Sequence, residues 1–128
     1  MQRTRVVLVD VPRILGDIVK DAVAHQADME VVADIASSPS LPSVVSETNT
    51  DVVVIGRELL GYDLELLRGC PGVAVLALVD DGRHALRYRL RPEPVRPDKD
   101  GANGISTELI VAAIRAEAQE LARHSQAR

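Results

Sequence analysis

Few side chains in this sequence combine a chemically useful type with a useful position. Asp10 directly follows the apolar run Val6–Val9, which is typical of a strand buried on both faces. Doubly wound proteins place their sites where the carboxyl ends of parallel strands meet, at one edge of the sheet. A carboxylate at that edge is a candidate metal ligand. A second apolar run, Asp51–Ile55, ends in Gly56, which has no side chain to contribute.

Isolated carboxylates are a weak basis for a metal site. Asp10 alone would bind a metal ion too weakly to matter, and we interpret it as a structural or helix-start acid. Asp80 and Asp81 follow the apolar run Val73–Val79 and are interpreted as helix-capping acids. The histidines lie on different predicted helices without a cluster of cysteines or acids at ligand spacing: His25, His84 and His124. We therefore expect no metal and no cofactor.

The sequence also lacks the motifs of a nucleophilic or nucleotide-binding enzyme. Cys70 precedes Pro71 in a predicted loop and has no histidine–acid set to activate it. Gly56-Arg57 lacks the glycine spacing and the lysine of a phosphate-binding loop. We expect a protein that is not an enzyme.

Composition narrows the class further. The chain has 128 residues, a length that fits one domain spanning residues 1–128. Hydrophobic residues make up 46% of it and include no Phe or Trp, so aliphatic side chains must fill the core. The net charge of −4 is not that of a general nucleic-acid binder. No apolar run has the length of a signal peptide or a membrane span, so a cytoplasmic protein is expected.

Short apolar runs alternate with segments of helical periodicity along the chain. This alternation predicts βαβ units and a three-layer, doubly wound parallel α/β sheet with the strand order 2-1-3-4-5. The fifth strand falls in the proline-rich segment 92–104 and is expected to be short, distorted or absent, which would leave the edge of strand 73–79 partly uncovered. The other predicted strands are Val6–Val9, Glu30–Ala36 and Asp51–Ile55. The predicted helices begin near Pro12, Leu41, Asp63, Arg83 and Ser106.

The order of these elements, with several short motifs, resembles the receiver domain of bacterial response regulators. The likeness is greatest to the branch that usually carries a helix-turn-helix output domain, and it covers almost the whole chain. Its motifs are individually weak, and their order and spacing carry the resemblance: Val9-Asp10, Asp51–Ile55, Leu60–Asp63, Glu65–Arg68, Asp80-Asp81 and Glu108–Arg115.

The resemblance implies a degenerate phosphorylation pocket. The family's acceptor aspartate corresponds to Gly56, and the second acid of its metal-binding pair corresponds to Val11, beside Asp10. The hydroxyl residue that ends the family's fourth strand corresponds to Val79, and the family's lysine corresponds to Lys99. A receiver with these replacements is expected neither to accept a phosphoryl group nor to hold Mg²⁺.

A basic feature lies beyond the pocket. Arg83, Arg87 and Arg91 are four residues apart and share one face of the predicted helix 83–91. This face is either a solvated surface or a docking surface for an acidic partner, and in the receiver family the corresponding helix belongs to the output surface. We expect a protein partner, with a second copy bound through the 83–123 face as one candidate. We expect no contact with membrane and no direct contact with nucleic acid.

Two functions remain open at this point. The first is an atypical receiver domain without a phosphoacceptor, acting independently of phosphorylation through protein–protein interaction in bacterial signal transduction or transcriptional regulation. The alternative is a receiver-like module that senses a small ligand in the vacated acidic pocket. Stabilisation against heat by a ligand would distinguish the second from the first.

Overall fold

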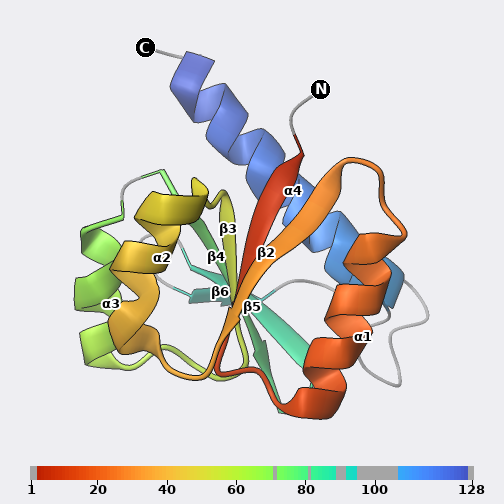
Figure 1. Cartoon of the computed structure of the whole chain (residues 1–128), viewed down its shortest axis with the longest axis horizontal. Helices are drawn as coiled ribbons and strands as arrows, with labels where there is room; N and C mark the ends of the chain where they lie inside the picture. Colours follow the sequence, from red (N-terminus) through yellow and green to blue (C-terminus); the bar gives the residue numbers. More distant parts are fainter. Residues whose placement is uncertain (1–2, 71, 81, 89–91, 95–106, 127–128) are drawn as a thin grey trace.

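The apolar runs of the sequence become the central strands of a six-stranded sheet with helices on both faces (Figure 1). The computed structural model describes residues 3–70, 72–80, 82–88, 92–94 and 107–126. The strands are β1 (Thr4–Val9), β2 (Met29–Ile35), β3 (Val52–Ile55), β4 (Ala74–Val79), β5 (His84–Tyr88) and β6 (Pro92–Pro94). The helices are α1 (Arg13–Ala24), the short 3-10 helix η1 (Ser38–Ser40), α2 (Leu41–Thr48), α3 (Gly61–Arg68) and α4 (Thr107–Gln126). Among these residues, no helix is both long and apolar enough to cross a membrane.

The strand order is β2-β1-β3-β4-β5-β6, which confirms the predicted order 2-1-3-4-5 for the first five strands. β1 pairs in parallel with β2 and β3, and β3 pairs in parallel with β4. Helices supply the crossovers that parallel neighbours need. β5 and β6 are antiparallel to their neighbours. The prediction of a parallel sheet is therefore correct for β1 to β4 and wrong for the last two strands.

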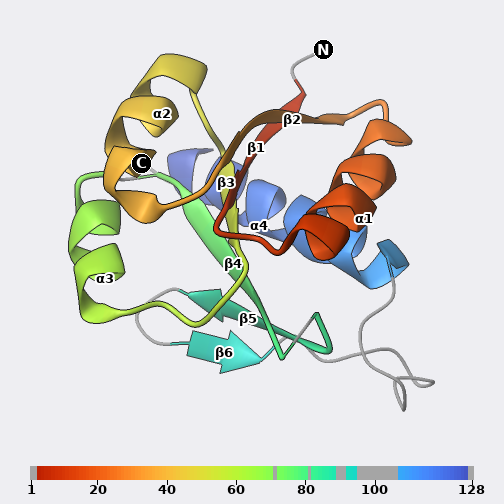
Figure 2. The same ribbon diagram turned by 60° about the horizontal axis from the view of Figure 1, so that its bottom comes forward.

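Each face of the sheet has its own apolar layer, because successive strand residues point to opposite faces. Val6 and Leu8 of β1 belong to the layer under α1 and α4, whereas Val7 and Val9 belong to the layer under α2 and α3. β3 is buried along its whole length, as a strand covered on both faces must be. Figure 2 shows this three-layer arrangement, with α1 and α4 on one side of the sheet and α2 and α3 on the other.

The predicted helix 83–91 is wrong, because residues 84–88 form β5. β5 folds back on β4 as a hairpin in which Val79 pairs with His84 and Val75 with Tyr88. The turn between the strands uses positive backbone angles, with φ 53° at Asp80 and 83° at Gly82. A φ of 83° favours glycine, and the residue at that position is Gly82. Asp80 therefore lies in a hairpin turn, and the prediction that it caps a helix is wrong.

The edge of β4 is covered, contrary to the expectation from the proline-rich segment. β5 pairs with β4 along Val75–Val79. Beyond it, β6 consists of Pro92–Pro94 and lies at the edge of the sheet, where residues without an N–H are tolerated. The rest of the segment in which the fifth strand was predicted, residues 95–104, lies outside the described residues.

Candidate functional site

The carboxyl edge of the sheet brings part of the predicted pocket together. β1 and β3 are neighbours in register, so Asp10 and Gly56, which directly follow them, lie side by side. The amide of Gly56 donates a hydrogen bond to the carbonyl oxygen of Val9 at 3.0 Å. Val79 ends β4, which is the next strand along this edge. Lys99 lies outside the described residues.

The loop between β1 and α1 packs closely on Gly56, which directly follows β3. A β-carbon at Gly56 would lie 2.5 Å from the carbonyl oxygen of Asp10, 2.6 Å from the Cα of Val11 and 2.9 Å from the Cδ of Pro12. The first two are backbone atoms, which cannot turn aside as a flexible side chain can. Packing therefore requires glycine here, and the loop fills the space that an aspartate side chain would need. The small ligand of the alternative function stays a prediction.

Arg57 supplies a cation at this edge. Its Nε donates a hydrogen bond to Oδ2 of Asp10 at 2.8 Å. Its Nη1 donates to Oδ2 of Asp63 at 2.6 Å and to the carbonyl oxygen of Glu58 at 3.1 Å. Its Nη2 donates to Oδ1 of Asp63 at 3.2 Å and to the hydroxyl oxygen of Tyr62 at 3.4 Å. These contacts give every N–H of the guanidinium an acceptor.

Asp63 is the buried end of this arrangement. Its side chain is 1% exposed, whereas that of Asp10 is 49% exposed. Oδ2 of Asp63 also accepts the backbone N–H of Leu60 at 2.7 Å, so the carboxylate caps the start of α3. An acid in the first turn of a helix interacts favourably with the positive end of the helix dipole. Arg57 therefore links the β1–α1 loop to the first turn of α3 through two carboxylates.

The surroundings of Arg57 keep it charged. The hydrogen bond to Asp63 is the largest cause that raises the pKa of Arg57 above its ordinary value, and the bond to Asp10 adds to it, although burial acts in the opposite direction. The Cζ atom lies 6.0 Å from the centroid of the Tyr62 ring, within the range of a cation–π contact. A permanent cation thus lies beside Asp10, at the edge where the receiver resemblance implies Mg²⁺ in phosphorylated members.

Metal binding at this edge is disfavoured by the same cation. Among the described residues, no group of three histidine, cysteine or acidic side chains could hold a metal ion. A divalent ion at Asp10 would meet the positive charge of Arg57 and compete for a carboxylate oxygen that Arg57 already holds. The expectation of no metal stays a prediction, and Arg57 gives it a physical reason.

Sequence reasoning did not identify Arg57 or Asp63 as residues of this site. The available signal was position, since Arg57 follows the third strand and its neighbour Gly56. Asp63 follows Arg57 by six residues and lies in the first turn of a helix. In this fold, the end of a strand lies next to the start of the helix that follows it. A basic residue at the first position and an acid at the second could therefore have indicated the ion pair between Arg57 and Asp63.

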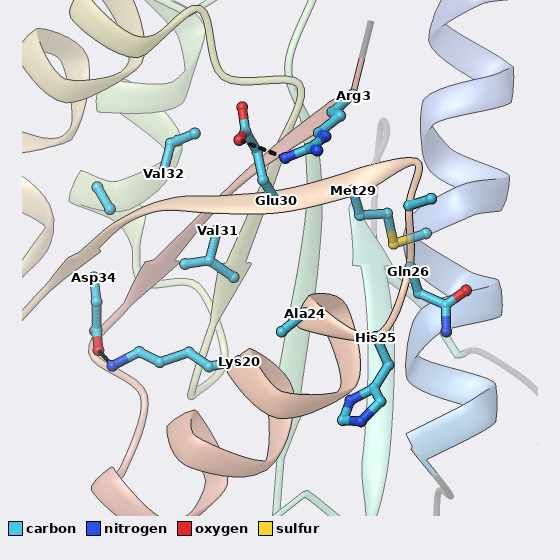
Figure 3. Close-up of a pocket in the computed structure, with 12 residues that line it drawn as sticks. Arg3, Lys20, Ala24, His25, Gln26, Met29, Glu30, Val31, Val32 and Asp34 are labelled. Carbon is cyan, nitrogen blue, oxygen red and sulfur yellow. Dashed lines mark ion pairs between the residues drawn. The ribbon is translucent and has the colours of Figure 1, made fainter. Parts of the chain in front are cut away.

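The described grooves of the surface lie away from this site. The larger, of about 830 Å³, runs along the edge of β2 and the C-terminal part of α1 (Figure 3). Two ion pairs border it, Arg3–Glu30 at 3.6 Å and Lys20–Asp34 at 2.6 Å. The smaller, of about 400 Å³, lies between α1 and the start of α4. Neither groove is lined by Asp10, Gly56 or Arg57, so neither corresponds to the vacated pocket.

The basic helical face predicted at 83–91 does not exist, because the segment is a strand. Arg83 is exposed in the hairpin turn, Arg87 lies within β5, and Arg91 is outside the described residues. The Nε of Arg87 lies 3.7 Å from Oε1 of Glu117 on α4, a residue that is 4% exposed. At this distance the two groups form an ion pair between β5 and α4 without a hydrogen bond, since the buried Nε of Arg87 has no hydrogen-bond partner among the described residues. A role of these arginines in partner binding stays a prediction, without the shared face on which it was based.

We expect Arg87→Glu to destabilise the fold, because it places a second carboxylate against the buried Glu117. The free energy of unfolding should fall by about 2 kcal/mol, which lowers the melting temperature by several degrees. Arg83→Glu is the matched control, since Arg83 is exposed, and it should change the free energy by less than about 0.5 kcal/mol. Thermal unfolding followed by circular dichroism compares the two. Equal melting temperatures would contradict the contact between Arg87 and α4.

Comparison with known proteins adds to this description. No protein-family model and no curated protein matches the chain. Among solved structures, the response regulator domain of Thermotoga maritima CheB matches with a TM-score of 0.64 over 92% of this chain and 98% of that one. The chain has a receiver-like fold. The sequence identity is 16%, so the match shows the fold alone, and the chemistry of this receiver-like domain must be argued from its own residues.

Proposed function

We propose that this receiver-like domain is an atypical receiver that works without phosphorylation, through protein–protein contact in bacterial signal transduction or transcriptional regulation. The observation that carries the proposal lies at Gly56. The residue offers no acceptor, and the backbone of Asp10 and Val11 fills the space that an acceptor side chain would need. A phosphorylated receiver is a two-state element that phosphate biases. Without an acceptor, phosphate cannot shift this domain between two states.

The charges at the carboxyl edge support the same function. Asp10 has a cation 2.8 Å away in Arg57, so a metal ion would have to displace it. Val11 offers no second carboxylate for the octahedral oxygen set that Mg²⁺ needs. Val79 offers no hydroxyl to a phosphoryl group. The helix-turn-helix branch that the sequence resembles would place such a module in transcriptional control.

The distribution of exposed apolar side chains supports a role in protein contact. Among the described residues, the large hydrophobic side chains with the greatest exposure lie on α1 and at the start of α3: Ile14 78%, Ile18 42%, Leu60 51%, Tyr62 49% and Leu64 43%. Both helices begin at the carboxyl edge, because each follows a parallel strand of the sheet. These side chains are therefore candidates for a protein-binding surface at this end of the domain.

We expect no phosphate adduct after incubation with acetyl phosphate and Mg²⁺, because the position that corresponds to the family's acceptor is Gly56, which has no side chain. Intact-mass measurement checks this, with a receiver domain that has its acceptor aspartate treated in parallel. The partner recovered from the host should bind with the same affinity before and after the treatment. A stoichiometric adduct, or binding that requires the phosphodonor, would contradict the proposed function.

The same binding measurement locates the contact surface. Ile14→Glu should weaken partner binding at least tenfold, because it places a charge among the exposed apolar side chains at the start of α1. Ala24→Glu is the matched control, since Ala24 is an exposed residue at the other end of the same helix. Equal losses of affinity in the two variants would exclude the carboxyl edge as the contact surface.

A further inference from the structure

The loop between β3 and α3 is held in place largely by side chains. The backbone N–H of Leu59 donates to the hydroxyl oxygen of Tyr88 at 3.3 Å, and that of Leu60 donates to the carboxylate of Asp63 at 2.7 Å. The carbonyl oxygen of Glu58 accepts from Arg57. A segment with few backbone partners opens at a low free energy unless its side-chain contacts hold it. Arg57 makes the contact to Glu58, and its bonds to Asp63 and Tyr62 tie the start of the loop to the first turn of α3.

Arg57 also fixes the loop on the other side of the edge. Its bond to Asp10 reaches across to the segment that follows β1, 47 residues earlier in the chain. That segment packs on Gly56, so the two loops touch through their backbones and are tied through one guanidinium. Charge-assisted hydrogen bonds, and bidentate pairs above all, are the stronger ones in proteins. Neither loop can move away without breaking at least one such bond.

We propose that Arg57 is a built-in cation that locks the carboxyl edge of the sheet in one arrangement. A switch needs two arrangements of similar free energy, between which a ligand selects. Here the guanidinium has an acceptor for every N–H, and its anionic partners come from the β1–α1 loop and the first turn of α3, so one arrangement is strongly favoured. The inference rests on the proposed function and deepens it, because it makes the domain constitutive, with a fixed state in place of phosphate control.

Amide hydrogen exchange tests the lock. We compare the amide of Leu60, whose acceptor is Asp63, with the amide of Leu76 at the centre of β4, whose exchange reports opening of the core. Arg57→Gln removes the charge and most of the donors. It should speed exchange at Leu60 at least tenfold more than at Leu76. Arg68→Gln is the matched control on the exposed end of α3, and it should change both amides equally. The same acceleration at Leu60 and Leu76 in Arg57→Gln would overturn the proposal.

The parent protein provides a second measurement in case Arg57→Gln fails to fold. With rising concentrations of denaturant below the unfolding transition, a locked edge opens only together with much of the domain. Exchange at Leu60 should then depend on denaturant as steeply as exchange at Leu76. Exchange at Leu60 that is independent of denaturant would show local opening and would overturn the lock.

The lock and the proposed function fail in different experiments. A phosphate adduct on the parent protein would overturn the proposed function, and it is measured by mass without reference to loop motion. Local opening at Leu60 would overturn the lock and leave the missing acceptor at Gly56 as it is. The two results can therefore be told apart in the same preparation.

Discussion

Gly56→Ala is expected to destabilise the domain by about 3 kcal/mol, at the upper end of the cost of overpacking. The added methyl group would lie 2.5 Å from the carbonyl oxygen of Asp10 and 2.6 Å from the Cα of Val11, so the β1–α1 loop has to move. That movement would also stretch the bond between Asp10 and Arg57. Equilibrium unfolding in denaturant measures the loss of stability.

Gly61→Ala is the matched control for this substitution. A β-carbon at Gly61 has no atom within 4 Å, and the residue begins α3, where alanine is the better helix former. We expect its free energy of unfolding to stay the same or to rise by about 0.5 kcal/mol. If Gly56→Ala behaves like Gly61→Ala, the close approach of the loop is not a constraint on the fold.

The same packing predicts the fate of a restored acceptor. Gly56→Asp should be at least as destabilising as Gly56→Ala, because it adds a carboxylate beside Asp10 to the same steric conflict. It should not restore phosphorylation, since the loop has to leave its position before the new side chain fits. The loss of the acceptor at Gly56 is therefore accompanied by a change in packing that a single substitution does not reverse.

Arg57→Ala should have the largest effect of any single substitution at this site. It removes the cationic partner from Asp63, whose side chain is 1% exposed, and breaking a buried pair in this way typically costs about 3–5 kcal/mol. Asp63→Ala should cost less, about 2–3 kcal/mol, although Asp63 is the more buried residue. The reason is that Arg57 is 26% exposed and keeps its bond to Asp10, so water and that carboxylate still solvate it.

The double variant Arg57→Ala with Asp63→Ala separates the pair from its surroundings. Because the two side chains interact directly, we expect the double variant to lose less stability than the sum of the single losses, by about 1–3 kcal/mol. Denaturant unfolding of the parent, the two single variants and the double variant measures this coupling free energy. A coupling near zero would mean that the contacts of 2.6 and 3.2 Å contribute little to stability.

The sequence by itself determined the centre of the fold and the missing acceptor. Buried parallel strands need unbroken apolar runs, and such runs mark β1, β3 and β4 in the sequence. The helical periodicity of 13–24 likewise predicts α1. Each of these patterns is local, so it can be read without knowing what packs against it. The absence of a carboxylate at Gly56 needs no structure at all.

In the segment after β4, the sequence pattern fits a helix and a strand equally well. Arginines four residues apart suit a helix, but residues with that spacing also share one side of a strand, which has a period of two. The Asp81-Gly82 pair between two apolar segments was a hairpin signal that the helical reading overlooked. The tertiary structure decided for a strand because β5 satisfies the backbone N–H and C=O groups along the edge of β4.

Only the tertiary structure decided what Gly56 and Arg57 do. The close approach at Gly56 and the bond from Arg57 to Asp10 join segments 47 residues apart in the chain. Neither the distance between those segments nor the burial of Asp63 can be read from residue type or spacing, because both depend on how two loops pack at the end of the sheet. The sequence indicates that a carboxylate is missing from this edge, and the folded chain shows that a backbone loop and a guanidinium occupy its surroundings.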